Sequence, residues 1–401
     1  MTMLNLLSQP ESWERFYTYK EGLTCQGSFL KYLRGFIDRK EYLPVCEAIA
    51  EGGKFPLPHK AVISKTGSRK KRTVYIYPTD ENMVLKLLTH LLLRKFDGLF
   101  APNLFSFRPG YSAKDAVRSL TKACGKQPFY AYKVDISDYF NSVPVAQFLP
   151  VLEQAAGEDA KLFRFLRELL EEQYVLDGDR AVTEQKGIMA GTPLSAFYAN
   201  LYLRGLDALF YERNIPYARY SDDIILFAES REKTEQYAAE IRECLSEHGL
   251  SVNPAKECFS APEEGWTFLG FRCCGTKIDI SPVSVRKLKQ KMRRKARALL
   301  RWRKRKNISG EKAAAAFIRI FNRKLLEQSD DSDLTWSRWF FSVINTTESL
   351  RQIDAYAQDC IRYLISGTRT KARFSVRYSD LKRLGYQSLV HAYYAETSNP
   401  F

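Results

Sequence analysis

Two adjacent carboxylates inside strand-like sequence constrain this chain more than any other feature. The stretch YARYSDDIILFAE, residues 217–229, places Asp222 and Asp223 between a short aromatic run and an apolar run. Both runs favour strands, and a tight turn is the natural way to join them. Adjacent like charges in a dry setting repel each other. A divalent cation relieves that repulsion because hard cations prefer carboxylate oxygens. The turn is therefore either a metal site or an ordinary solvated acidic turn.

A third carboxylate favours the metal site. The stretch FYAYKVDISDYFNSV, residues 129–143, begins with aromatic and β-branched residues that predict a core strand, and Asp135 lies near its C-terminal end. A carboxylate at a strand end beside a carboxylate-bearing hairpin is the arrangement that holds two cations. Two cations about 3.5–4 Å apart can activate an attacking hydroxyl and stabilise a leaving pyrophosphate.

The formal charge of +16 is concentrated in one segment. Residues 286–306 hold 13 of the 62 Lys and Arg residues and no acid, which leaves 49 basic against 46 acidic residues elsewhere. Apolar residues recur through this segment at mostly three- to four-residue spacing, which predicts an amphipathic helix with a basic face. Nucleic acid is the favoured partner of such a face, and an acidic membrane surface is the competing interpretation.

Composition places the chain among globular proteins. It has 401 residues, of which 45% are hydrophobic, and no run of 18 apolar residues, so we expect no membrane span. The start of the sequence lacks the pattern of a secretory signal. Eight scattered cysteines form no Cys-X-X-Cys pair, which suggests neither zinc nor a disulfide framework and favours the cytoplasm.

The order of motifs between about residues 60 and 271 resembles the palm domain of reverse transcriptases. Asp135 lies in a stretch similar to motif A, GIMAGTPLSAFYANLYL (187–203) resembles motif B, and Tyr220-Ser221-Asp222-Asp223 resembles the Tyr-X-Asp-Asp box of motif C. GLSVNPAKECFS (249–260) and WTFLGF (266–271) resemble motifs D and E. RTVYIYP (72–78) and LFSFRPGYSAKDAV (104–117) resemble finger motifs of bacterial, group II intron-like enzymes.

This resemblance implies an α+β right-hand polymerase with fingers, a split βαβ palm and a helical thumb. We expect N-terminal helices and fingers over residues 1–125. The palm is expected over 126–278, with a return to the fingers near 145–180. The helical thumb and a C-terminal extension would follow over 279–401. Within this frame, Thr192 is the expected N-cap and Pro193 the first residue of the motif B helix, and residues 231–247 form the next helix.

The resemblance also implies the metal ligands. Asp135, Asp222 and Asp223 would be the catalytic residues and would hold two Mg²⁺ or Mn²⁺ ions, with help from the backbone carbonyl of Ile136. The implied reaction is nucleotidyl transfer by an RNA-directed DNA polymerase.

Further residues are implied around the incoming deoxynucleoside triphosphate, each beside a structural alternative. Phe140 matches the bulky ring that collides with a ribose 2′-hydroxyl, or is a core phenylalanine. Arg72, with Lys71, would clamp the triphosphate, or lies at a solvated hairpin tip. Lys256 would neutralise or protonate the leaving pyrophosphate, or is a surface lysine.

Motif B departs from the common Gln-Gly-X-X-X-Ser-Pro form, because Thr192 replaces Ser and Gly187 replaces Gln. This puts a glutamine contact to the nucleotide in doubt. Gly191 still allows close backbone approach to the nucleotide, next to Pro193.

Nucleic-acid contacts are expected from two places. Arg108 either contacts the template or pairs within the fingers. The basic helix would bind an RNA/DNA duplex through a track of six residues: Arg286, Lys289, Arg293, Arg294, Arg297 and Arg301.

Motif B and the tyrosine-rich tail resemble those of bacterial defence-associated and abortive-infection reverse transcriptases. The narrowest assignment is the type 2 defence-associated group. That resemblance implies a dedicated non-coding RNA template and antiphage defence. Two alternatives remain open: untemplated or protein-primed DNA synthesis, and a non-catalytic RNA-binding scaffold.

Overall fold

The structure is a computed structural model that describes residues 2–23, 27–64, 71–125, 127–327 and 336–397. The chain divides into two compact units. The first contains Met1–Leu23 and Gly27–Glu264, and the second contains Gly265–Phe401. Helices and several sheets are mixed in one chain, so the expected α+β class is confirmed.

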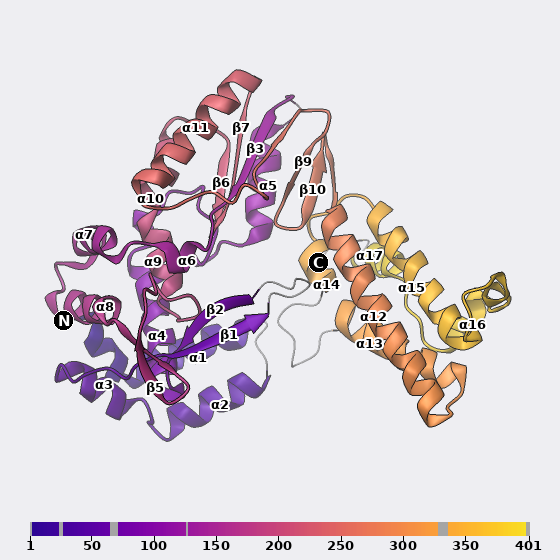
Figure 1. Ribbon diagram of the computed structural model, residues 1–401, viewed down its shortest axis with the longest axis horizontal. Coiled ribbons are helices and arrows are strands. Elements are labelled where there is room, and N and C mark those ends of the chain that lie inside the picture. Colours follow the sequence, from indigo (N-terminus) through magenta and orange to yellow (C-terminus); the bar gives the residue numbers. More distant parts are fainter. Residues whose placement is uncertain (1, 24–26, 65–70, 126, 328–335, 398–401) are drawn as a thin grey trace. The chain divides into compact units, whose positions relative to one another are not determined.

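The first unit surrounds two four-stranded sheets with helices (Figure 1). Its helices are α1 (Pro10–Gly22), α2 (Gly27–Asp38), α3 (Leu43–Ala50), α4 (Thr79–Lys95), α5 (Ala113–Cys124), α6 (Tyr139–Ser142), α7 (Val145–Ala156), α8 (Ala160–Glu171), α9 (Ser195–Tyr202), α10 (Arg204–Glu212) and α11 (Arg231–Glu247).

The sheet that carries the aspartates has the order β6-β7-β3-β8 and is antiparallel throughout. Its strands are β3 (Tyr130–Asp135), β6 (Tyr217–Tyr220), β7 (Asp223–Ala228) and β8 (Cys258–Ser260). Strand β7 is apolar and buried along most of its length, and helix α11 packs against β3 and β7. The residues of the α11 helix match the expected range 231–247, and Ser230 caps it.

The other sheet of this unit has the order β2-β1-β4-β5. Strands β1 (His59–Ser64) and β2 (Lys71–Ile76) form an antiparallel pair. Residues 65–70, which separate the two strands in the sequence, lie outside the described residues. Strands β4 (Tyr174–Asp177) and β5 (Arg180–Thr183) were not expected, because both are short and mostly exposed and so lack a clear apolar pattern.

The second unit combines a small sheet with helices. The sheet, in the order β11-β10-β9, contains β9 (Trp266–Phe268), β10 (Phe271–Cys274) and β11 (Lys277–Ile280). The helices are α12 (Pro282–Lys306), α13 (Gly310–Leu325), α14 (Trp336–Phe340), α15 (Glu348–Ser366), α16 (Tyr378–Arg383) and α17 (Leu389–Thr397).

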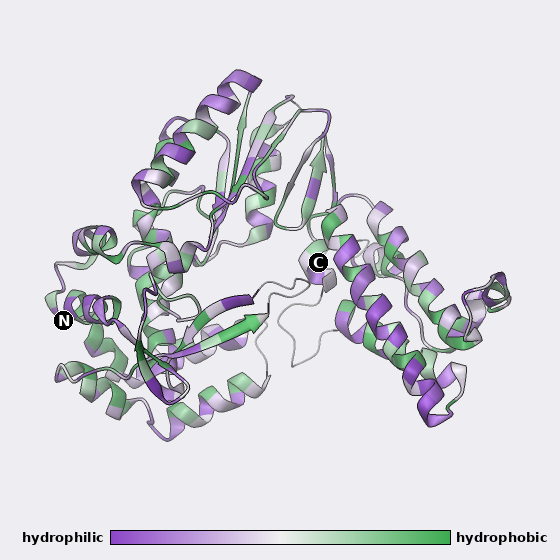
Figure 2. Cartoon of the chain, viewed as in Figure 1, coloured by the Kyte–Doolittle hydropathy of each residue, from purple (hydrophilic) through white to green (hydrophobic). Residues whose placement is uncertain are grey.

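Helix α12 is the expected basic amphipathic helix. It begins at Pro282, four residues before the basic run, with Ser281 as its N-cap. Val285, Met292 and Leu299 are buried against the neighbouring helices α13 and α15. Polar and apolar residues alternate along the helix (Figure 2). Among the helices of the described chain, none has the length and apolar character of a membrane span.

Candidate active site

The sheet register brings the predicted carboxylates to one edge. Asp135, the last residue of β3, lies directly opposite Asp223, the first residue of β7. The backbone N–H of Ile136 donates to the carbonyl of Asp222 at 2.9 Å. The motif A strand and the motif C turn are therefore joined by a backbone hydrogen bond at the carboxylates themselves.

The turn between β6 and β7 is short and strained. Tyr220 pairs with Asp223, so Ser221 and Asp222 alone form the loop. Ser221 is buried and has a φ of +61°, a conformation that L-residues seldom adopt. Such a residue costs about 1–3 kcal/mol and persists only where its surroundings hold it. The surroundings of this turn should therefore contain a strong constraint.

The loop that resembles motif D is tied to the same edge. The N–H of Asn253 donates to the carbonyl of Asp135 at 2.8 Å, and the N–H of Ser137 donates to the carbonyl of Ser251 at 2.8 Å. These bonds carry Lys256 to the site, where its ammonium forms an ion pair with the Asp135 carboxylate. Lys256 is about half exposed. Lys256 therefore lies beside the carboxylates, which is where a role at the leaving pyrophosphate would require it.

Electrostatics at this edge favour a bound cation. Desolvation raises the pKa of Asp222, and the charges of Asp135 and Asp223 raise it further. Desolvation also raises the pKa of Asp223, although Lys133, 3.7 Å away, partly opposes the shift. Positive charge at this edge comes from Lys133 and Lys256.

The donor set fits a divalent metal. Clustered carboxylate oxygens are the ligands that hard cations prefer, and a cation would relieve the repulsion that raises these pKa values. Within the described residues, no three His, Cys, Asp or Glu side chains already form a metal-binding group. The residues that would hold the ion are Asp135, Asp222 and Asp223, with the Ile136 carbonyl as an expected additional ligand.

Phe140 and Arg72 meet beside this edge. The guanidinium carbon of Arg72 lies 5.5 Å from the centroid of the Phe140 ring, within the range of a cation–π contact. Phe140 is buried, and its carbonyl accepts a hydrogen bond from the N–H of Ile188 at 2.8 Å. Lys71 precedes Arg72 on β2 and is exposed. The fingers strand, motif A and motif B therefore converge at Phe140.

The start of motif B differs from the expectation. Helix α9 begins at Ser195, after Leu194, so Thr192 is not its N-cap and Pro193 is not its first residue. The Thr192 hydroxyl instead donates to the carbonyl of Met189 at 3.0 Å, inside the preceding turn. This local bond competes with capping, and the helix begins two residues later than expected.

Gly191 lies in this turn against strand β2. Its φ is +99°, and a Cβ there would lie 2.9 Å from the Cβ of Val74 and 3.1 Å from the carbonyl oxygen of Tyr75. The neighbouring Ala190 carbonyl accepts a hydrogen bond from the N–H of Tyr75 at 2.8 Å. Gly191 thus allows the motif B turn to pack on the strand that carries Arg72.

We expect Gly191→Ala to displace β2 and weaken nucleotide use. The strained φ and the clash with backbone should destabilise the first unit by about 1–3 kcal/mol and raise the KM for deoxynucleotides. Gly205→Ala is the matched control, because Gly205 lies in helix α10 with nothing within 4 Å of its Cβ position. Steady-state kinetics and thermal melting of both variants test this expectation. Equal behaviour of the two variants would contradict it.

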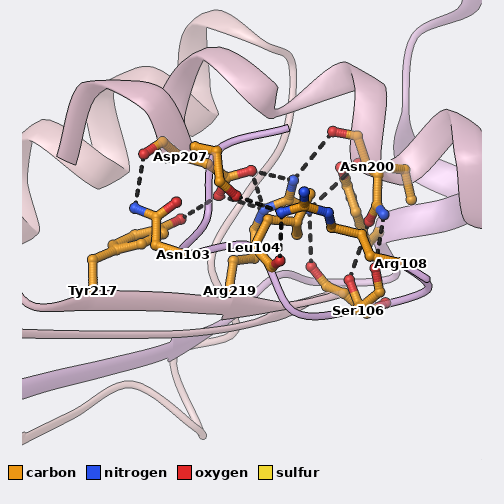
Figure 3. A network of polar contacts seen from close by, with 12 residues as sticks. Asn103, Leu104, Ser106, Arg108, Asn200, Asp207, Tyr217 and Arg219 are labelled. Atoms are coloured by element: carbon orange, nitrogen blue, oxygen red, sulfur yellow. Dashed lines mark hydrogen bonds and ion pairs between the residues drawn. The ribbon is translucent and has the colours of Figure 1, made fainter. Parts of the chain in front are cut away.

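A buried ion pair supplies the constraint on the strained turn (Figure 3). The guanidinium of Arg219 donates to the carboxylate of Asp207, with Nη2 2.6 Å from Oδ2, and both side chains are fully buried. Arg219 also donates to the carbonyls of Ala199, Asn200 and Ser221. One side chain thus links the motif C turn to the motif B helix.

Sequence reasoning missed this pair. Burial lowers the pKa of Arg219, but the Asp207 carboxylate raises it more, so the net shift is upward and the group stays charged. The hydroxyl of Tyr217 donates to Asp207, and the side-chain amide of Asn103 donates to its carbonyl. The four polar residues are far apart in the sequence. The one available signal was Arg219, a charged residue in an otherwise uncharged strand, which indicates a buried partner.

Arg108 takes the second of its two expected roles. It is buried and forms an ion pair with Asp97, with Nε 2.8 Å from Oδ1. The remaining donors reach the backbone of Ala101, Leu104 and Asp97. Internal acceptors thus engage the guanidinium of Arg108 in this structure, and its contact with the template stays a prediction.

The basic residues of α12 do not form one continuous track. Arg286, Lys289 and Arg293 line a cavity of about 450 Å³ shared with β10, β11 and α15. Arg294 lines a different cavity, of about 540 Å³, shared with α13. The six predicted contact residues pair with no carboxylate among the described residues. These basic side chains are thus available to a ligand, but they lie on two different sides of the helix.

The antiparallel sheet, with carboxylates at the adjoining ends of β3 and β7, defines the palm of a right-hand polymerase. A family model described as reverse transcriptase (RNA-dependent DNA polymerase) matches residues 63–273, more than half of the chain. The chain belongs to this family.

Individual relatives are distant. A Schizosaccharomyces pombe protein, named as an uncharacterized 91 kDa protein in cob intron, is 26% identical over 153 residues. The match covers 37% of this chain and 18% of that protein, so the chain spans only part of its relative.

Solved structures to which the chain shows similarity include two telomerases. Telomerase from Candida albicans, in complex with a TWJ fragment of telomeric RNA, shares 11% identity at a TM-score of 0.46, covering 89% of this chain and 71% of that one. Apo telomerase from Candida tropicalis shares 12% identity at a TM-score of 0.47, covering 82% and 69% of the two chains.

Proposed function

We propose that the protein is an RNA-directed DNA polymerase that acts by two-metal nucleotidyl transfer. The observation that carries the proposal is the pairing of Asp135 with Asp223 at adjacent strand ends, hydrogen-bonded through Ile136 to Asp222. When bound there, divalent cations, Mg²⁺ or Mn²⁺, would supply activation of the primer hydroxyl and stabilisation of the leaving pyrophosphate.

The chain's own residues complete the proposed site. Arg72 presents a guanidinium suited to the triphosphate of the incoming deoxynucleotide, with exposed Lys71 beside it. Lys256, whose pKa is raised because Asp135 outweighs the effect of burial, carries a positive charge next to the leaving group. Gly191 and Pro193 form the motif B turn under the nucleotide. The exposed residues of α12 would bind the RNA/DNA duplex.

The sequence motifs also support a narrower subgroup and a biological role. The form of motif B and the tail support membership of the bacterial defence-associated and abortive-infection reverse transcriptases, with the type 2 defence-associated group as the narrowest assignment. We accordingly propose a dedicated non-coding RNA as template, a role in antiphage defence, and a place in the bacterial cytoplasm.

Protein priming is the second candidate, and the exposure of Tyr394 favours keeping it. The hydroxyl of Tyr386 donates to Asp354 and that of Tyr393 donates to the carbonyl of Ile344, and both residues are buried. Tyr394 is 50% exposed. A covalent primer in this part of the tail would therefore start at Tyr394 rather than at its two buried neighbours.

One experiment separates these functions. The purified protein, with the RNA that accompanies it, is incubated with deoxynucleotides or ribonucleotides, and the products are sequenced. Complementary DNA copied from that RNA supports the proposal. Products without a template match, or DNA that remains attached to Tyr394, favour the second candidate. No synthesis under any condition would leave the RNA-binding scaffold.

We expect Phe140→Ala to relax sugar selectivity. Removing the ring should raise ribonucleotide use relative to deoxynucleotide use about 10–100-fold, because the site would no longer exclude a 2′-hydroxyl. Phe148→Ala is the control, since Phe148 is a fully buried core residue packed on Tyr198 and Tyr202. It should lower stability but leave the ratio unchanged. An unchanged ratio in Phe140→Ala would show a core role alone.

A further inference from the structure

The cavity between the small sheet, α12 and α15 has an unusual charge balance. It holds about 450 Å³ within the second unit. Four cationic side chains line it: Arg272 from β10, and Arg286, Lys289 and Arg293 from α12. Among the described residues, none of the four lies within ion-pair distance of a carboxylate.

The two carboxylates that line the same cavity are already engaged. Asp279 lies opposite Arg272 in the sheet, but its oxygens accept hydrogen bonds from the N–H groups of Ile280 at 2.7 Å and Ser349 at 3.2 Å. Glu348 forms an ion pair with Lys277, which is not part of the lining. Both acids thus lie in the lining, but neither forms an ion pair with the four cations, which outnumber them.

An aromatic ring completes the lining. Tyr356 of α15 faces α12, and the ammonium of Lys289 lies 5.9 Å from the centroid of its ring. The amide side chains of Gln290 and Gln352 add neutral donors and acceptors. Converging cations suit a phosphate, since charge-assisted bonds to phosphate are stronger than neutral ones. A half-buried aromatic face suits a nucleobase.

We propose that this cavity binds a nucleotide that carries a terminal phosphate. The phosphate would lie among Arg272, Arg286 and Arg293, with the base against Tyr356. The ligand is either a free nucleotide or the 5′-phosphorylated end of a strand, since both offer the same chemistry. The site shares Arg286, Lys289 and Arg293 with the proposed duplex contacts. Binding here nevertheless requires neither the aspartates nor synthesis, so it can be tested separately from the polymerase activity.

Adjacent residues on α12 give a matched test. Arg293 lines this cavity, whereas Arg294 lines the separate cavity shared with α13. Arg293→Gln and Arg294→Gln remove the same charge from neighbouring exposed positions of one helix. A general electrostatic surface would respond equally to both changes, and a built site would respond to the first alone.

Calorimetric titration of the full chain in EDTA, where no metal supports the polymerase site, measures binding. The probes are AMP, adenosine, and a hexadeoxynucleotide with a 5′-phosphate or a 5′-hydroxyl. We expect AMP to bind more tightly than adenosine, or the phosphorylated strand to bind more tightly than its hydroxyl twin. The first result assigns a free nucleotide and the second a strand end.

In either case Arg293→Gln should lower the affinity for the preferred probe at least about tenfold, because one charge-assisted hydrogen bond is lost. Arg294→Gln should change that affinity less than about twofold. Equal losses in the two variants would overturn the proposal, and so would the absence of any preference for the phosphate. Circular dichroism of both variants checks that each remains folded.

Discussion

Asp207→Ala is expected to destabilise the first unit by roughly 3–5 kcal/mol, because it leaves the buried Arg219 charge without its partner. The two side chains are fully buried and 2.6 Å apart. Tyr217 would also lose its acceptor. Urea unfolding measures the loss of stability of the protein. Hydrogen exchange of the β6 and β7 amides shows whether the loss is centred on the strands beside the ion pair. We expect DNA synthesis to fall with it, since Arg219 holds the carbonyl of Ser221.

Two further variants separate stability from positioning. Glu240→Ala removes the ion pair between Arg213 and Glu240, which has the same 2.6 Å separation but is partly exposed, and it should cost less than about 1 kcal/mol. The double variant Asp207→Leu with Arg219→Met removes both charges and should recover most of the stability. If that double variant also recovered full synthesis, Arg219 would have no positioning role.

Asp222→Asn is expected to abolish DNA synthesis without harming the fold. Loss of a metal-binding carboxylate should lower activity more than about 100-fold, since even outer-shell partners of metal ligands cost 10–100-fold. The pKa of Asp222 is raised by desolvation and by Asp135 and Asp223. Because its pKa is raised on folding, the charged form of Asp222 lowers stability at pH values above the ordinary pKa of an aspartate, and removing that charge should leave stability equal or higher.

RNA binding gives the second measurement on Asp222→Asn. The basic helix α12 belongs to the other unit and is unchanged, so RNA affinity should stay near that of the unaltered protein. Asp177→Asn is the control, because Asp177 is an exposed aspartate at the end of the β4–β5 hairpin and should leave synthesis intact. Undiminished synthesis by Asp222→Asn would end the assignment of the site.

Local patterns predicted the parts of the fold that depend on local physics. The apolar run after Asp223 predicted β7, the spacing of residues 231–247 predicted α11, and the basic amphipathic segment predicted α12. The resemblance to reverse transcriptases located the three aspartates, and the sheet register then placed them together.

Long-range contacts account for what the sequence could not show. The bond from Asn253 to Asp135 spans the whole motif C hairpin and α11. The pairing of Arg108 with Asp97, and of Arg219 with Asp207, depends on which residues the fold desolvates. The division of the basic face of α12 depends on where α13 and α15 pack. None of these follows from periodicity or composition.

Anomalous diffraction can locate manganese at the strand ends, in crystals that also contain a non-hydrolysable deoxynucleoside triphosphate analogue. We expect manganese bound by Asp135 and Asp222, with the ammonium of Lys256 no longer paired with Asp135. Manganese held by other residues, or a bound analogue with Lys256 still on Asp135 and no anomalous signal at the strand ends, would contradict it.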